Sequence, residues 1–179
     1  MGKVTVAILV PIGNFRVNLT GGKIMKFIKQ ACLLLVGISL AGTSFAANDP
    51  LMKAIKARQG EMQLRSFNAG PLFGMAKGEI DYDADMAGKL ANNLKLLLDL
   101  DMSRSWPKGS DNENYAGKTT ALPKIWTTYP EIADYGKKYA MAVNELAAVA
   151  GNGKDALKSK LGALGKSCKG CHDEFREKK

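Results

Sequence analysis

The spacing of six residues near the C-terminus constrains the fold of this 179-residue chain more than any other feature. They follow one another at steps of four, three, four, three and four residues: Leu157, Leu161, Leu164, Cys168, Cys171 and Phe175. Because an α-helix turns once in about 3.6 residues, this spacing places all six on one stripe. Such a stripe is the seam of an antiparallel helical bundle. We therefore predict a final helix, capped by Asp155, that packs against other helices along its length.

The first helix of the folded part is predicted to begin just after Asp49. The Asp49 carboxylate can cap it, and Pro50 suits its first turn. The following residues recur at helical spacing: Leu51, Ile55, Arg58 and Met62. Gly70-Pro71 is expected near the end of this helix or at a bend, since proline removes a helical hydrogen bond.

A second helix is predicted from a cap at Asp83 or Asp85 to about Met102. Its apolar stripe is Met86, Leu90, Leu94 and Leu97. A connection rich in Gly, Ser, Asn and Asp then covers residues 103–122. A third helical segment is predicted over residues 123–150, with Pro130 as a kink or boundary. Strand patterns are weak, so the predicted fold class is all-α, an antiparallel four-helix bundle.

The first 46 residues are predicted to be a targeting segment. Residues 25–46 have a basic start, a short apolar run and small residues before a cut after about Ala46, which is typical of a secretory signal. The apolar run is shorter than the roughly 20 residues that span a bilayer, so we expect no membrane anchor in the mature protein. Residues 1–24 fit no part of a signal, and we interpret them as an extension upstream of the true start. The mature domain is then 47–179, in the periplasm.

The net charge of +9 does not indicate nucleic-acid binding. Residues 1–46 hold five of the 26 Lys and Arg and no acidic residue, which leaves +4 for the rest. Those remaining charges are mixed in sign, without a basic stripe interleaved with aromatic residues. Cys32 lies inside the predicted signal, so the mature chain would keep only Cys168 and Cys171.

A C-x-x-C-H motif at residues 168–172 carries the chemistry of this chain. Cys168, Cys171 and His172 share one face of a helix because they stand at i, i+3 and i+4. Two thiols at that spacing can reach the two vinyl groups of one porphyrin, and the imidazole can bind its iron. This pattern is the attachment signature of c-type haem. The sequence therefore predicts one covalently attached haem c, with His172, the single histidine, as the metal ligand.

Three other uses of the cysteine pair compete with haem attachment. A thioredoxin-like pair expects a βαβ context and a helix N-terminus that lowers a thiol pKa, whereas this pair stands late in a helix. A zinc site needs further ligands, and the chain has no second Cys/His pair. A disulfide, the ordinary outcome after export, gives His172 no role. A haem-free thiol oxidoreductase is the alternative from another functional class.

The chain resembles the class II c-type cytochromes, cytochrome c′ above all, over about residues 49–178. The likeness rests on the C-terminal position of the C-x-x-C-H motif and on further matching segments: Arg58-Gln59, Gly70-Pro71, Trp106, residues 123–126 and residues 165–176. The resemblance implies a bundle whose C-terminal helix attaches one haem c, and homodimers formed through the first two helices. It also implies electron exchange with an unidentified redox partner protein. We predict no enzymatic activity, because no base, nucleophile or substrate-sized constellation is visible in the sequence.

Similarity to this family assigns further roles residue by residue. Arg58 and Gln59 match a pair that contacts the haem propionate and edge, and a guanidinium suits a carboxylate because it can pair with it as a fork. Thr120 matches a residue of the connection that touches the haem. Arg176 lies one turn after His172, where its charge can tune the iron.

Met62 decides which mechanism the resemblance implies. It stands four residues after Arg58, at a position where cytochrome c′ has a bulky apolar residue on the distal face. The iron would then be five-coordinate, in an apolar pocket that is open only to small neutral gases such as NO and CO and excludes water and anions. In the alternative, the Met62 thioether binds the iron and the protein is a low-spin electron carrier. Met62 as mere core packing is the third possibility.

Overall fold

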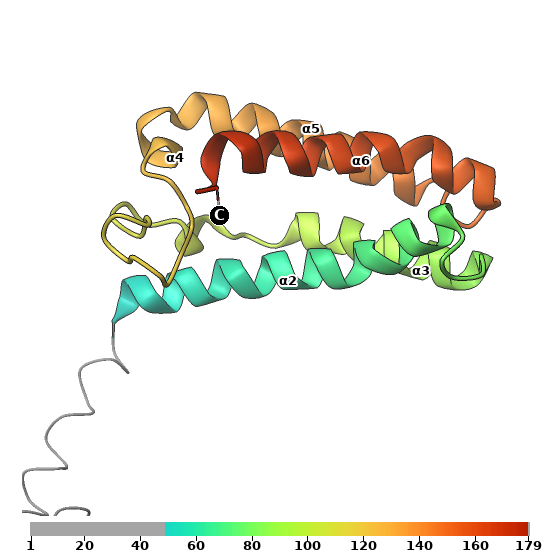
Figure 1. Cartoon of the computed structure of the whole chain (residues 1–179), viewed down its shortest axis with the longest axis horizontal. Helices are drawn as coiled ribbons and strands as arrows, with labels where there is room; N and C mark the ends of the chain where they lie inside the picture. Colours follow the sequence, from blue (N-terminus) through green and yellow to red (C-terminus); the bar gives the residue numbers. More distant parts are fainter. Residues whose placement is uncertain (1–48, 179) are drawn as a thin grey trace, which may run out of the picture. The chain divides into compact units, whose positions relative to one another are not determined.

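The computed structural model of the chain describes residues 49–178, which form an all-α bundle as predicted (Figure 1). Its four long helices are α2 (Pro50–Lys77), α3 (Ala84–Leu96), α5 (Tyr129–Ala147) and α6 (Lys154–Phe175). The predicted extension 1–24, the predicted signal 25–46 and the cut after Ala46 lie outside the described residues. Within residues 49–178, no helix is both long and apolar enough to cross a membrane.

Helix α2 begins as the sequence predicts but extends further than predicted. The Asp49 carboxylate accepts hydrogen bonds from the backbone nitrogens of Leu51 at 2.9 Å and Met52 at 3.1 Å. Pro71 lies inside the helix, which ends only at Lys77. The carbonyl of Phe67 loses its partner there, but Phe67 is 76% exposed, so water can take that hydrogen bond.

The other helices agree with the predictions at Pro130 and differ from them at the end of α3, at Met86 and at the start of α6. Helix α3 starts after the predicted cap Asp83 but ends at Leu96, and a 3-10 turn (Leu97–Asp99) follows it. Met86, predicted in its apolar stripe, is exposed, because α3 packs through small residues: Ala87 and Ala91 beside Leu94. Pro130 marks a boundary, since it lies in the first turn of α5, after the short helix α4 (Lys124–Thr127). The N-cap of α6 is Gly153, whose φ of 120° suits glycine, and not Asp155.

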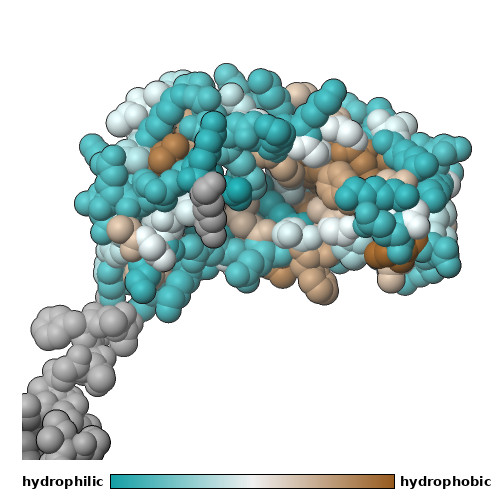
Figure 2. Space-filling view, in the orientation of Figure 1, coloured by the Kyte–Doolittle hydropathy of each residue, from teal (hydrophilic) through white to brown (hydrophobic). Residues whose placement is uncertain are grey.

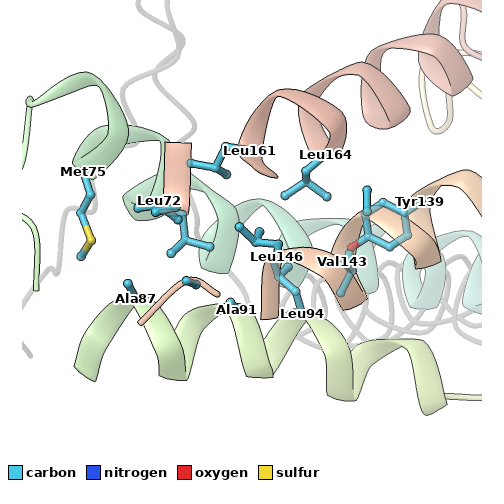
Figure 3. Close-up of a cluster of buried hydrophobic side chains, with 13 residues drawn as sticks. Leu72, Met75, Ala87, Ala91, Leu94, Tyr139, Val143, Leu146, Leu161 and Leu164 are labelled. Atoms are coloured by element: carbon cyan, nitrogen blue, oxygen red, sulfur yellow. The ribbon is translucent and has the colours of Figure 1, made fainter. Parts of the chain in front are cut away.

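The hydrophobic core fills the part of the bundle farther from the C-terminal end of α6. Figure 3 shows leucines of α6, among them Leu161 and Leu164, beside Val143 and Leu146 of α5. The cluster contains thirteen buried residues: Leu72, Met75, Ala87, Ala91, Leu94, Tyr139, Ala142, Val143, Leu146, Ala150, Leu157, Leu161 and Leu164. Along α6 this cluster stops at Leu164, before the C-x-x-C-H motif. The seam predicted from the sequence thus has a packed part and a part that lines a cavity. Its last member, Phe175, is buried beyond the motif, with its ring edge-on to Tyr135.

Candidate haem site

A cavity of about 500 Å³ opens between α2, α5 and α6 where the packed core ends. Helix α6 contributes Cys168, Cys171 and His172 to its wall, and α2 contributes Met62. Hydrophobic residues gather on the surface between α2 and α6 (Figure 2). The structure therefore brings four of the predicted site residues together around one space of the size of a cofactor site.

The two thiols on this wall are free and half-buried. Burial raises the pKa of both Cys168 and Cys171, and the positive charge of Arg65 opposes that rise. The pKa of His172 is lowered, first by burial and then by the nearby charge of Arg176. A neutral imidazole is the form that binds a metal, and a raised thiol pKa is the opposite of what a reactive redox cysteine needs.

A second, more polar cavity lies on the other side of His172, which lines both cavities. Gln59, Thr120 and Arg176 line this space. The Gln59 amide nitrogen donates to the carbonyl of Lys118 at 2.7 Å, which holds the connection against α2. The Arg176 backbone nitrogen donates to the His172 carbonyl at 3.2 Å, and Arg176 is exposed. Three more predicted site residues thus surround the imidazole from the polar side.

Arg58 stands apart, since it lines neither cavity. Its side chain is 3% exposed, and it donates to Ser110 Oγ at 2.6 Å, to the Ser110 carbonyl and to Thr119 Oγ1 at 3.0 Å. Its guanidinium also lies 4.9 Å from the centre of the Trp106 ring. Arg58 therefore fastens the connection to α2, while its contact with a haem carboxylate stays a prediction.

The cavity wall also contains a polar cluster that was not predicted from the sequence. Arg65 forms an ion pair with Glu61, and its guanidinium lies 4.3 Å from the ring centre of Tyr139. All three residues line the cavity, so the predicted apolar pocket also contains a charged pair and a phenol. The signal was present, because Glu61 and Arg65 stand at i and i+4 on the helix that carries Met62.

These residues fit a haem c group on grounds that the structure itself supplies. The cavity is mainly apolar, and it presents two free thiols and an imidazole along one helix. The Tyr139 hydroxyl, which is buried, has no hydrogen-bond partner among the described residues. Among these residues, no group of three or more Cys, His, Asp and Glu gathers to hold a metal ion by protein ligands alone. The fold and the site define a class, the four-helix bundles that carry a C-terminal c-type haem motif.

Comparison with known proteins agrees with that class. Residues 53–176 match the family model described as Cytochrome C′. Cytochrome c′ of Cereibacter sphaeroides is 36% identical over 125 residues, which cover 70% of this chain and 83% of the relative. Cytochrome c-554 of the same organism is 34% identical over 147 residues, covering 81% of this chain and 95% of that protein. The solved structure of cytochrome c′ from Rhodobacter sphaeroides is 34% identical and superposes with a TM-score of 0.71. The match covers 73% of this chain and 100% of the chain in that structure.

The chain belongs to the cytochrome c′ family of mono-haem c-type cytochromes. The family match spans the bundle from the first turn of α2 to the end of α6, so it includes the whole lining of the cavity that contains Cys168, Cys171 and His172.

Proposed function

We propose that this protein binds one haem c through thioether bonds to Cys168 and Cys171, with His172 holding the iron. The observation that carries the proposal is the single cavity lined by all three side chains and by Met62. The haem, when bound, supplies reversible one-electron chemistry and an iron that can take a small gaseous ligand. The protein supplies attachment, access and electrostatics, and no enzymatic activity is proposed.

Met62 guards the distal side in this proposal. It comes from α2 and lines the cavity opposite the motif of α6, and it is 37% exposed, which is unlike a residue that merely fills a core. A bulky thioether side chain there leaves room for diatomic gases and little else. A variant of cytochrome c′ from Alcaligenes xylosoxidans, 28% identical with a TM-score of 0.63, was solved as a nitric oxide complex. We extend NO and CO binding, with five-coordinate iron, to this chain.

The remaining parts of the proposal concern export and assembly. We propose that residues 25–46 direct export to the periplasm, that the mature chain starts at Ala47, and that residues 1–24 are absent from the translated protein. Intact mass measurement of the exported protein tests the cleavage after Ala46. Peptide mapping of the unprocessed precursor tests the start at Met25, which a peptide from residues 4–23 would contradict.

We also propose a homodimer through α2 and α3. Both helices expose large apolar side chains, among them Phe67 at 76% and Leu96 at 56%. Replacing Phe67 with Glu puts a charge on that face, and we expect analytical ultracentrifugation to show a monomer. A wild-type protein that is monomeric at micromolar concentration would refute the dimer. The redox partner protein stays unidentified.

Mass spectrometry of the protein from a host that matures c-type cytochromes tests the attachment. The wild type should keep its haem after denaturation, at one per chain. Cys168→Ala and Cys171→Ala should each keep one thioether bond at most, and the double variant should lose the haem. Ser167→Ala, one residue before the motif, is the matched control and should keep it. A wild-type protein without covalent haem would overturn the proposal.

A further inference from the structure

We propose that Arg65, held by Glu61 and Tyr139 on the cavity wall, is a hydrogen-bond donor to a small anion bound at the haem iron. The inference rests on the proposed function, because it needs haem in the cavity and an open coordination position. It goes beyond that function because it names a ligand class, small anions such as cyanide, that an apolar pocket would disfavour.

Two contacts fix the Arg65 guanidinium in place. Its Nε donates to Glu61 Oε1, and the ring of Tyr139 lies beside it, with 4.3 Å from the guanidinium carbon to the ring centre. The Glu61 side chain is 6% exposed and that of Arg65 is 28% exposed, so the pair is largely removed from solvent. A buried ion pair that stays in place gives its donors a defined direction.

Part of the hydrogen-bonding capacity of Arg65 is unused. An arginine carries five N–H donors, and within residues 49–178 its only hydrogen bond is the one from Nε to Glu61. The two terminal nitrogens therefore have donors left for a molecule in the cavity. Tyr139 adds a second buried polar group without a partner in the described part of the chain, its hydroxyl.

The position of Arg65 relates these donors to the distal side. Arg65 follows Met62 by three residues on α2, so the two share one face of that helix. Both line the cavity whose other wall is formed by Cys168, Cys171 and His172 of α6, the helix facing α2 in Figure 1. A ligand on the side of the iron away from His172 would lie toward the wall that contains Arg65.

The charge of the donor selects the ligand class. Hydrogen bonds from a cationic donor to an anionic acceptor are shorter and stronger than neutral ones, and the distal donors of a haem pocket influence which ligand the iron keeps. Carbon monoxide accepts a hydrogen bond poorly. Glu61 opposes an anion, since its negative charge lies on the same wall. Arg65 and Glu61 should therefore influence anion affinity in opposite directions.

The test is a titration of the ferric holoprotein with cyanide, followed by absorption at one fixed pH. In Arg65→Met, we expect the dissociation constant for cyanide to rise about tenfold, the size of one lost hydrogen bond to a charged group. In Glu61→Gln, which keeps an acceptor for Arg65 Nε, we expect cyanide to bind several-fold tighter. Arg104→Met is the matched control, since Arg104 is exposed and lines neither cavity. The ferrous affinity for CO should stay close to that of the wild type in all of them.

The outcomes separate this inference from the proposed function. Normal CO binding with cyanide affinity unchanged in both cavity variants overturns the donor role alone. Weaker cyanide binding in both variants indicates a structural effect of the pair and also overturns it. A wild-type protein that binds neither CO nor cyanide has a closed iron, and then the proposed function fails together with the inference. If Arg65→Met yields no holoprotein, the tighter binding expected for Glu61→Gln still decides the question.

Discussion

The guanidinium of Arg58 donates a hydrogen bond to Ser110 Oγ at 2.6 Å and thereby joins α2 to the long connection that precedes α4. The same side chain is buried and also donates to Thr119 Oγ1. Thr119 precedes Thr120, which lines the polar cavity beside His172. The position of that cavity wall therefore depends on a contact between residues 52 positions apart in the sequence.

Replacing Arg58 with methionine should destabilise the protein by about 2–4 kcal/mol. Methionine roughly keeps the volume but leaves the buried acceptors of Ser110 and Thr119 without their donor, which costs about 1–3 kcal/mol for each such group. Urea unfolding of the holoprotein measures this loss. Arg104→Met removes an exposed arginine and should change stability by less than about 0.5 kcal/mol. Equal stability of the two variants would show that the Arg58 network contributes little.

Leu157→Ala should destabilise the packed part of the bundle. Leu157 is fully buried in the core cluster, and its truncation leaves a cavity that costs about 2–5 kcal/mol. Leu64→Ala provides the same chemical change on α2 at a side chain that is 50% exposed, and it should cost far less. The comparison uses the unfolding midpoints of both variants. A small effect of Leu157→Ala would mean that the core can relax around the missing side chain.

Acid should destabilise the start of α2 through Asp49. Hydrogen bonds to its carboxylate, from the Met52 backbone and from Tyr115, hold the pKa of Asp49 below its usual 3.8. Because the folded pKa is the lower one, the stabilisation is complete above the unfolded pKa and is lost as pH falls through the folded pKa. Asp49→Asn keeps a capping oxygen and cannot titrate, so its stability should fall less steeply below about pH 4. Stability curves of equal steepness in acid would contradict this.

Met62→Ala should increase the affinity of the ferrous protein for CO. The substitution removes side-chain bulk from the cavity wall opposite α6. Because Met62 is partly exposed, we expect a smaller loss of stability than for Leu157→Ala. Carbon monoxide titration followed by absorption measures the change. If Met62 is instead a ligand of the iron, the wild type will not bind CO, and Met62→Ala will bind it.

Local patterns account for the parts of the structure that the sequence predicts well. The α2 cap at Asp49, the boundary at Pro130 and the seam of α6 each depend on residues within a few turns of one another. The end of α3 was predicted too late, because leucines continue past Leu96 although the backbone turns into a 3-10 helix there. The N-cap of α6 is Gly153 and not the predicted Asp155, because the chain reverses direction between α5 and α6 through a backbone conformation that suits glycine.

Contacts between residues far apart in the sequence determine the features of the site that local patterns do not predict. The burial of Arg58 depends on a connection 47 to 61 residues away, whose course no periodicity indicates. The role of Arg65 depends on Tyr139 of α5, which lies beside it only after the bundle forms. The C-x-x-C-H motif predicts Cys168, Cys171 and His172, whereas the other predicted site residues depend on the resemblance to cytochrome c′. The charged pair was overlooked because an i, i+4 pair is ordinary on an exposed helix face.

Absorption spectra of the exported protein, oxidised, reduced and reduced with carbon monoxide, test the central claim most directly. We predict a haem c protein whose ferrous spectrum is high-spin and shifts when CO is added, because the iron has an open position guarded by Met62. A sharp low-spin spectrum indifferent to CO would contradict the open iron and favour an electron carrier with a closed sixth position. A colourless protein from a host able to attach haem would contradict the assignment of Cys168, Cys171 and His172 as a haem site.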